Sequence, residues 1–246
     1  MSLSGRGVVV TRPRGLAEAF AAALERRGAR ALVFPAIEIE ELPAPARLAR
    51  LADYDYVIFI SPTAVRVALP KLTAWPPSVT AAAIGSGTRR ELERFGVPRI
   101  LSPQAGADSE ALLAVEEMKH IAGKEILVVR GVGGRAQLGD ALEARGAQVH
   151  FAECYRRLRP SGDAAPLLQA WREGRVDAVT VSSAEGFDNF VAMVGAEGRT
   201  LLSRTPLFVP HARVAQHART GGEVVVAGPG DDETIERLVA YFHGRT

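Results

Sequence analysis

Hydroxyl-bearing residues, glycines and arginines gather directly after the apolar segments of this chain. They suit anion binding, because hydroxyls and backbone N–H groups donate hydrogen bonds and an arginine fork holds a carboxylate through two of them. In open α/β sheets, ligands bind outside the carboxyl ends of the strands. The pattern therefore predicts two binding rims, although serine, threonine and glycine also cap helices and turn loops without touching a ligand. The segments concerned are Thr11–Arg14, Ser61–Thr63, Gly85–Thr88, Arg130–Arg135, Ser182–Glu185, Val209–His211 and Ala227–Asp231.

Tyr155 is the residue best suited to proton transfer. It follows an apolar segment that contains Val149 and Phe151 and directly precedes Arg156, and the repeat described below pairs it with Ile37. A phenol donates one hydrogen bond and accepts another, so it can give a proton to a leaving group without the help of a metal. The competing interpretation is a half-buried tyrosine in a connecting strand.

Motifs of several other chemistries are incomplete in this chain. Gly131-Val-Gly133-Gly134 lacks the full dinucleotide fingerprint and its downstream acid, and there is no Walker A sequence. The five histidines lack metal-ligand spacing with one another and with Cys154, and Ser183 lacks the glycines of a nucleophile elbow. The sequence therefore favours a site without a nucleotide, a metal or a serine nucleophile.

The segments that must position these residues form an internal repeat. Residues 8–38 match residues 126–156 at a shift of 118 positions, without a gap. A weaker match, at a shift of 122, joins residues 55–61 to residues 177–183. Such a repeat sets the architecture in which every single motif lies. A duplicated α/β chain predicts two similar lobes with a cleft between them.

Apolar strands alternate with amphipathic helices along the whole chain. Leu16, Phe20 and Leu24 fall on one helix face, and Gly28 follows as a C′ glycine. This alternation predicts an α/β fold of two similar three-layer lobes with parallel sheets. Strands are predicted at 7–11, 31–34, 55–60, 79–84, 99–101, 125–129, 148–153, 177–181, 206–209 and 223–227. Helices are predicted at 15–27, 62–69, 87–95, 108–119, 135–145, 163–173, 184–194, 211–219 and 231–242.

Two charged segments interrupt the alternation. Residues 36–42 alternate apolar and acidic side chains, and residues 153–159 are rich in arginine. The acids can face the arginines across an antiparallel pair, at about 0.2–1 kcal/mol for each opposite-charge contact. We therefore predict a two-stranded antiparallel ladder that joins the lobes, with two ordinary strand ends and solvated charges as the alternative. The charged residues are Glu38, Glu40, Glu41, Arg156, Arg157 and Arg159.

Composition is that of an ordinary globular protein. The chain has 246 residues, 47% of them apolar, and its net charge of +2 argues against nucleic-acid binding, which needs a clustered basic surface. There is no apolar stretch of about 18 residues, and the N-terminal residues lack the pattern of a secretory signal. The single cysteine, Cys154, excludes an intramolecular disulfide framework. We therefore expect a cytoplasmic protein with neither a membrane nor a nucleic acid as partner.

Short motifs give the chain a resemblance to the uroporphyrinogen-III synthase family over essentially its whole length. Their order and spacing together carry the resemblance. The matching segments are Val8–Pro13, Phe59–Val65, Ala83–Thr88, Asp108–Leu113, Val129–Gly131 with Gly134–Arg135, Tyr155 and Val181–Ser183.

The resemblance implies two lobes in which the N-terminal strand-helix-strand belongs to the C-terminal lobe. Residues 1–36 and 160–246 would form one lobe and residues 43–150 the other, with residues 37–42 and 151–159 as hinge strands. It also implies the cyclisation of hydroxymethylbilane to uroporphyrinogen III, with loss of water, inversion of the last pyrrole ring and no cofactor. The implied partners are the linear tetrapyrrole substrate and the upstream bilane-forming enzyme, and the chain is expected to act as a monomer.

By the same resemblance, Tyr155 is the candidate catalytic acid. Family members often carry a threonine-containing loop where this chain has His211, so His211 either takes over a substrate contact or leaves this part of the rim less engaged. The candidate substrate-binding residues are Arg12, Ser61, Thr63, Ser86, Thr88, Arg130, Ser182, Ser183 and His211.

Two other functions compete with this expectation. A non-catalytic two-lobed module would bind a tetrapyrrole tightly without closing it into a ring. A nucleotide-sugar transferase could also use twin α/β lobes, but the phosphate-binding and acidic motifs that it would need are missing.

Overall fold

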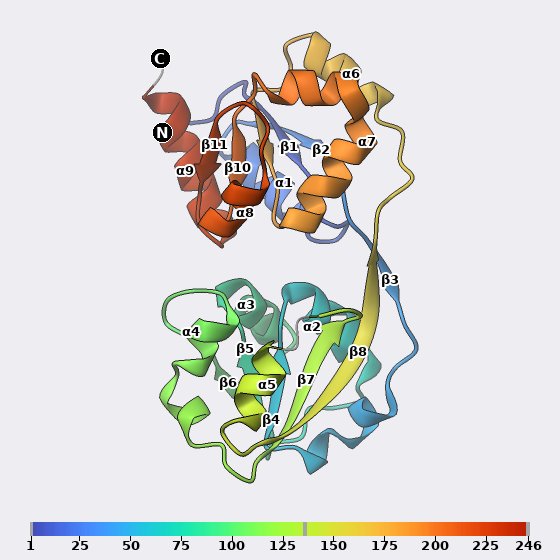
Figure 1. Ribbon diagram of the computed structural model, residues 1–246, viewed down its shortest axis with the longest axis vertical. Coiled ribbons are helices and arrows are strands. Elements are labelled where there is room, and N and C mark those ends of the chain that lie inside the picture. Colours follow the sequence, from blue (N-terminus) through green and yellow to red (C-terminus); the bar gives the residue numbers. More distant parts are fainter. Residues whose placement is uncertain (1, 135–136, 245–246) are drawn as a thin grey trace. The chain divides into compact units, whose positions relative to one another are not determined.

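Two β-sheets organise the chain, one in each of two units (Figure 1). The computed structural model describes residues 2–134 and 137–244. Unit 1 consists of Met1–Ile39 and Leu158–Thr246, and unit 2 of Glu40–Arg157. The chain therefore crosses between the units twice, and both crossings fall within the segments predicted as hinge strands.

The sheet of unit 1 has the strand order β11-β10-β9-β1-β2 and is parallel throughout. Its central strands are fully buried and the two edge strands are partly exposed. Short runs of valine, leucine and alanine are typical of parallel strands that helices cover on both faces. The strands are β1 (Gly7–Val10), β2 (Arg30–Val33), β9 (Ala178–Thr180), β10 (Leu207–Val209) and β11 (Val224–Val226).

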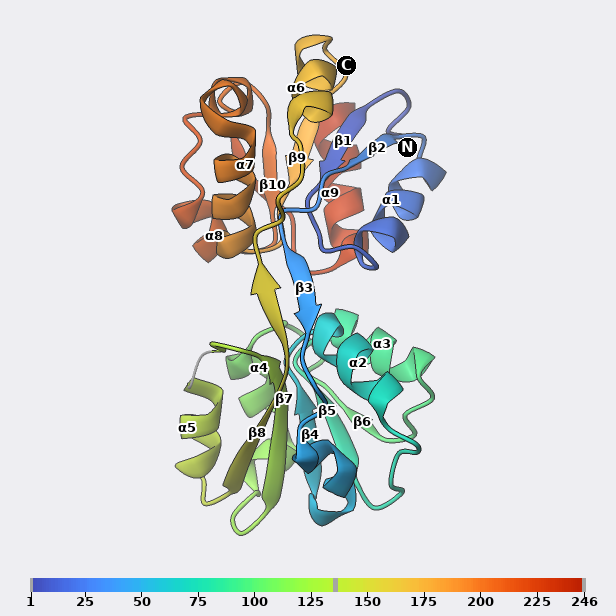
Figure 2. The ribbon, with the colours of Figure 1, turned by 90° about the vertical axis from the view of Figure 1, so that its right-hand side faces the viewer.

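Helices cover both faces of this sheet. Successive side chains of a strand point to opposite faces, so each buried strand contributes apolar residues to both sides. Val8 and Val10 belong to the core cluster of α1 (Ala17–Arg26) and α9 (Asp231–His243). Val9 belongs to the opposite cluster, which α6, α7 and α8 complete (Figure 2). These three helices are α6 (Ala165–Arg172), α7 (Ala184–Leu202) and α8 (Ala212–His217).

The sheet of unit 2 has the strand order β3-β8-β7-β4-β5-β6. Five of its strands are parallel, and β3 runs antiparallel to β8 (Figure 2). The strands are β3 (Glu38–Glu41), β4 (Tyr56–Phe59), β5 (Thr80–Ala83), β6 (Ile100–Leu101), β7 (Glu125–Gly131) and β8 (Gln148–Leu158).

Helices also cover both faces of the unit 2 sheet. One face carries α2 and α3, and the other carries α4, α5 and η3, which share a core cluster with β4 and β7 (Figure 2). The α-helices are α2 (Pro62–Ala68), α3 (Ser86–Arg94), α4 (Ser109–Leu113) and α5 (Gln137–Glu143). The 3-10 helices are η1 (Ala46–Asp53), η2 (Leu69–Lys71) and η3 (Glu116–Lys119).

The strand registers reproduce the internal repeat. β1 pairs with β2 in the register in which β7 pairs with β8, once positions are shifted by 118. β9 pairs with β1 as β4 pairs with β7, under the two shifts of 122 and 118. Both sequence matches are therefore confirmed as structural matches. The order along the chain differs, because the β1-α1-β2 segment precedes the other strands of its sheet whereas β7-α5-β8 follows them.

Local sequence explains where some of the helices end. Gly28 and Gly146 follow α1 and α5 with φ angles of 87° and 85°, the left-handed region that a C′ glycine supplies without strain. The prediction of one helix over 108–119 was wrong, since α4 ends at Leu113 and a separate 3-10 turn follows. The first two residues of the helix predicted at 135–145 lie outside the described residues.

The two charged segments form neighbouring strands of unit 2. Leu42 N donates to Cys154 O over 2.9 Å, and Arg156 Nη1 lies 3.2 Å from Glu40 Oε2. The predicted charge pairing is confirmed for this pair, whereas Glu41 is paired with Lys71, which the sequence did not indicate. β8 is also longer than the strand predicted at 148–153, because it continues without a break into the charged segment.

Candidate functional site

Tyr155 lies in β8 and is almost fully buried, with 2% of its surface exposed. Its hydroxyl oxygen is 3.0 Å from Ser61 Oγ, and its carbonyl accepts a hydrogen bond from Val132 N over 2.8 Å. The ring lies against Gly131, where an added Cβ would come within 2.7 Å of Tyr155 Cε2. Strand β8 and the end of β7 thus fix the ring, and Ser61 fixes the hydroxyl.

Ser61 and Ser183 occupy matching places in the two units. Each is an N-cap: Ser61 Oγ accepts from Ala64 N over 3.1 Å at the start of α2, and Ser183 Oγ accepts from Gly186 N over 3.0 Å at the start of α7. Such a cap satisfies a backbone N–H that the helix leaves open. Both serines therefore cap helices, as the alternative to ligand binding proposed. Thr63, in the first turn of α2, is half-buried.

Ser86 and Thr88 begin α3 and differ in exposure. Ser86 is exposed, whereas Thr88 is 2% exposed and belongs to the interior. Gly85 precedes them as the N-cap, and an added Cβ there would come within 2.6 Å of the Ala107 side chain. This close approach explains the glycine of the motif by packing alone.

Arg130 is held by three different contacts. Its guanidinium donates to Glu153 Oε1 over 3.1 Å and to Gly134 O over 3.2 Å, and it stacks over Phe151 at 4.1 Å. Its buried Nε has no hydrogen-bond partner among the described residues. The side chain is 15% exposed. Arg130 therefore braces the glycine loop that follows β7.

Arg12 repeats this arrangement in unit 1. It forms an ion pair with Asp231 at the start of α9 and stacks over Phe20 at 4.3 Å. Arginine on an aromatic face gains about 0.5–2 kcal/mol. Since each arginine already has a carboxylate partner, a substrate carboxylate would have to share or displace Asp231 or Glu153.

Ser182 and His211 follow two other strands of unit 1. Ser182 is exposed in the turn after β9. His211 is half-buried at the N-cap of α8, and its side chain makes no capping hydrogen bond there. Both side chains keep donors or acceptors that the helix ends do not use.

The predicted residues divide between the units at equivalent strand ends. Ser61, Thr63, Ser86, Thr88, Arg130 and Tyr155 lie in unit 2, and Arg12, Ser182, Ser183 and His211 lie in unit 1. Most of them follow the carboxyl ends of parallel strands, where ligands bind in open α/β sheets, whereas Arg130 lies just before the last residue of β7 and Tyr155 lies within β8. Tyr155 has no counterpart in unit 1, since Ile37 holds the matching position.

Three contributing residues were not among the predicted site residues. Asp231 and Glu153 are the partners of the two arginines, and Gly131 makes room for the tyrosine ring. The repeat singled out both arginines but gave no sign of their acids, because Glu153 matches Pro35 in the other copy and Asp231 lies outside both copies. Gly131 could be noticed only as part of a glycine-rich loop.

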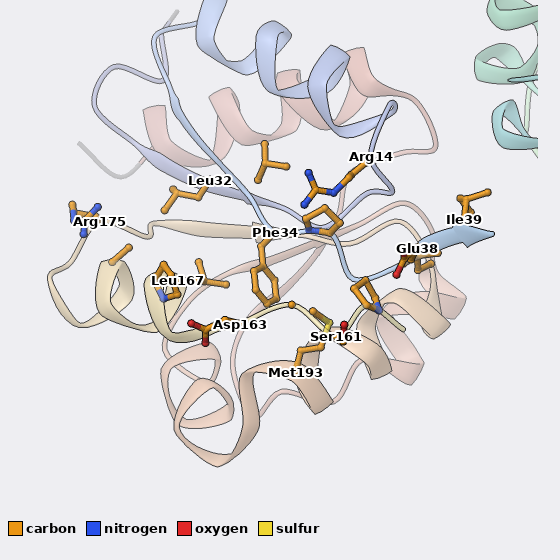
Figure 3. Close-up of a pocket in the computed structure, with 17 residues that line it drawn as sticks. Arg14, Leu32, Phe34, Glu38, Ile39, Ser161, Asp163, Leu167, Arg175 and Met193 are labelled. Atoms are coloured by element: carbon orange, nitrogen blue, oxygen red, sulfur yellow. The ribbon is translucent and has the colours of Figure 1, made fainter. Parts of the chain in front are cut away.

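A separate cavity of about 780 Å³ lies within unit 1 (Figure 3). Leu32, Phe34 and Leu167 supply apolar surface, and Arg14 and Asp163 are charged lining residues. None of the ten predicted site residues lines it. The predicted site residues therefore lie elsewhere in the two units.

Other chemistries find little support among the described residues. Burial raises the pKa of the Cys154 thiol to about 11, an effect that the charge of Lys71 only partly offsets, so the thiol stays protonated at neutral pH. Within residues 2–134 and 137–244, no three His, Cys, Asp or Glu side chains are grouped as metal ligands. Every helix in the same part of the chain is too short or too polar to cross a membrane.

Fold and site together define a duplicated α/β protein: two parallel-sheet units, each with hydroxyls and an arginine at its strand ends, and a buried tyrosine in one unit. A family model described as "Uroporphyrinogen-III synthase HemD" matches residues 18–240. The chain belongs to the uroporphyrinogen-III synthase family.

Individual relatives agree with this assignment. Uroporphyrinogen-III synthase of Escherichia coli strain K12 is 35% identical over 243 residues, which cover 94% of this chain and 99% of the relative. The Salmonella typhimurium synthase is 36% identical with the same coverage. Among solved structures, a mutant synthase of Thermus thermophilus matches at a TM-score of 0.60 and 20% identity, covering 98% of each chain. The Helicobacter pylori enzyme also gives 0.60, at 14% identity over 96% of this chain and 99% of its own. At these identities the two structures support the fold.

Proposed function

We propose that this protein closes hydroxymethylbilane into uroporphyrinogen III, with loss of water and inversion of the last pyrrole ring, and that Tyr155 is its proton donor. Family membership over most of the chain supports the reaction. The observation that carries the chemistry is the Tyr155 phenol, 3.0 Å from Ser61 Oγ beside the carboxyl ends of β4 and β7.

The first step is the loss of the terminal hydroxyl group. Tyr155 gives its proton to the hydroxyl oxygen, the C–O bond breaks with its electron pair on that oxygen, and water leaves. The pyrrole nitrogen supplies electrons to the carbon left behind, so a proton donor is the main requirement. The last ring attacks this carbon through its already substituted position and forms a spiro intermediate. The bond from that position to the bridging carbon of the neighbouring ring then breaks, and this bridging carbon bonds to the free α position of the last ring, which inverts the ring. The proton released as the ring regains aromaticity balances the one that Tyr155 gave.

Binding must fold a flexible chain into this reacting shape. Holding reacting atoms in place contributes about 7–11 kcal/mol in well-oriented cases. In our proposal, substrate carboxylates accept hydrogen bonds from Ser86, Ser182 and backbone N–H groups, while Arg12 and Arg130 supply positive charge. Because Tyr155 is 2% exposed, the residues around it must move for the substrate to reach the phenol oxygen.

Cellular context completes the proposal. The protein would act as a monomer in the cytoplasm and receive its substrate from the bilane-forming enzyme. A lone buried cysteine, which leaves no intramolecular disulfide, suits that compartment. Sedimentation of the purified protein alone tests the monomeric state, and sedimentation of its mixture with the bilane-forming enzyme tests the association between the two.

The decisive experiment is an isomer assay. Purified protein is incubated with hydroxymethylbilane, the product is oxidised, and the uroporphyrin isomers are separated, with heat-denatured protein as the control. We expect isomer III in excess. Isomer I alone would refute the synthase activity, and tight substrate binding without ring closure would favour a non-catalytic binding module.

A further inference from the structure

The Ser61 hydroxyl joins the start of α2 to the Tyr155 phenol. Its oxygen accepts a hydrogen bond from Ala64 N over 3.1 Å and lies 3.0 Å from the Tyr155 hydroxyl oxygen. A serine hydroxyl has two acceptor positions and one donor hydrogen. Once Ala64 N–H fills one acceptor position, the hydroxyl hydrogen remains free to point at the phenol oxygen.

Capping alone does not require this second contact, as unit 1 shows. Ser183 caps α7 with the same geometry, but the repeat places Ile37 where unit 2 has Tyr155. Ile37 lies beside this helix start, since an added Cβ on Gly186 would be 3.5 Å from Ile37 Cδ1. One unit therefore has a serine cap against a hydrocarbon and the other has a serine cap against a phenol.

The tyrosine ring is also confined on its other side. Gly131 leaves so little space that an added Cβ would lie 2.7 Å from Cε2 and 2.9 Å from Cζ of Tyr155. The backbone adds a hydrogen bond between Val132 N and Tyr155 O of 2.8 Å. With its ring held in this way, the phenol oxygen is kept beside the Ser61 hydroxyl.

We propose that Ser61 is a positioning residue for Tyr155 and not a substrate-binding residue, an inference that rests on the proposed function. The Ser61 hydroxyl donates to the phenol oxygen, which leaves the phenol's own hydrogen directed toward the substrate. After proton transfer the same hydrogen bond stabilises the phenolate, since a bond to a charged acceptor is stronger than one to a neutral acceptor. The hydrogen bond from Ala64 N–H polarises the serine and strengthens the chain of donors.

A set of Ser61 variants tests this role by its effect on kcat and KM. Ser61→Ala should lower kcat about tenfold, the worth of one hydrogen bond to a charged group, with KM for hydroxymethylbilane unchanged. Ser61→Thr keeps the hydroxyl and should restore most of kcat. Ser61→Gly serves if Ser61→Ala folds poorly, because glycine is nearly as good an N-cap and also lacks the hydroxyl. The Ser61→Ala/Tyr155→Phe double variant should be no slower than Tyr155→Phe alone.

Ser183→Ala calibrates the loss of a cap. It should lower the melting temperature about as much as Ser61→Ala does, which measures capping without reference to activity. A raised KM with unchanged kcat would overturn the proposal in favour of substrate binding, and so would multiplying effects of the Ser61 and Tyr155 variants. If the wild-type protein makes no isomer III, the proposed function itself fails, whereas an active wild type with an unimpaired Ser61→Ala variant removes only the positioning role.

Discussion

The Tyr155 hydroxyl is a single polar group on a side chain that otherwise belongs to the core. Tyr155→Phe keeps the ring and removes that oxygen alone. We predict that kcat falls at least about a hundredfold, the usual worth of a general acid. The fold should survive, because one neutral hydrogen bond contributes about 1 kcal/mol. Isomer III formation and thermal unfolding of the variant measure the two effects separately.

Tyr54 offers a matched control for this substitution. It is also a buried tyrosine of unit 2, 9% exposed, and its ring meets His150 edge-on at 5.7 Å. Burial raises the pKa of its phenol, and the charged groups that also influence this pKa (Arg47, Glu125, Arg50 and Asp53) are not predicted site residues. Tyr54→Phe should keep the wild-type rate. If Tyr155→Phe behaves the same way, the tyrosine is a structural residue and the acid must be sought elsewhere.

For single residues, the sequence indicated which side chains belong to the candidate site better than it indicated which side chains they contact. The repeat identified Arg12 and Arg130 as equivalent, and the structure gives both an acidic partner and an aromatic face. The acids could not be predicted, because Asp231 is 219 positions from Arg12 whereas Glu153 is 23 from Arg130. Partners so different in sequence distance depend on the chain topology, which no local pattern contains.

Glu91 joins two helices of unit 2. Both of its carboxylate oxygens accept from the Arg66 guanidinium over 2.9 Å, which links α3 to α2, and Arg94 adds a contact of 3.1 Å. The Glu91 side chain is only 10% exposed. Burial would raise the pKa of its carboxyl, but hydrogen bonds and charge from Arg66 and Arg94 outweigh burial and lower it. The carboxylate is therefore more stable in the folded than in the unfolded chain.

We predict that Glu91→Gln lowers the free energy of unfolding by about 1–3 kcal/mol at neutral pH, because a partly buried guanidinium loses its charged partner. The folded pKa lies below the unfolded value near 4.5, so this stabilisation is present above that value and is lost as pH falls through the folded pKa. Urea unfolding of both proteins at pH 7 and about pH 3 should show the difference shrinking in acid. An undiminished difference at the lower pH would mean that the carboxylate charge contributes nothing.

Helix lengths were harder to predict than helix positions. The pattern predicted a helix over 184–194, and the first helical stretch of α7 does end there, because Gly195 is non-helical at φ 65° and ψ −159°; a second stretch, which was not predicted, continues to Leu202. A glycine normally indicates the end of a helix, as Gly195 does here, but the apolar residues beyond it gave too weak a signal to predict the second stretch. Leu202 is buried in the core with Phe190, so tertiary packing explains the continuation.

For the whole molecule, the repeat was the most informative feature of the sequence. It predicted two like sheets, and the registers agree position for position under the shifts of 118 and 122. Repeat spacing alone would divide the chain near its middle, whereas the N-terminal β1-α1-β2 segment joins the C-terminal strands. That exchange depends on which strand edges pair, and both copies have the same apolar pattern. The family resemblance, and not periodicity, implied it.

Each of the two core clusters of unit 1 therefore combines residues from both ends of the chain. Phe190 of α7 is fully buried in one of them and contacts Phe34 and Trp171, with ring centroids 5.9 and 6.2 Å away. Its cluster includes Val9 of β1. A cavity at Phe190 should weaken both chain ends together, and Phe→Ala in a core costs about 3–5 kcal/mol.

Hydrogen exchange of Phe190→Ala can follow this loss along the chain. Cooperative units open as wholes, so amides of β1 and β2 should exchange faster together with those of β9 and β10, although most of the sequence separates the two groups. Amides of β4, β5 and β7 should keep their wild-type rates, because their core is a different cluster. Leu142→Ala, in that second cluster, is the reciprocal control and should affect β4, β5 and β7 while β1, β2, β9 and β10 keep their wild-type rates. Faster exchange confined to residues after 160 would show that the N-terminal segment is not an energetic part of unit 1, and an equal rise in both sheets would show that the two cores unfold as one.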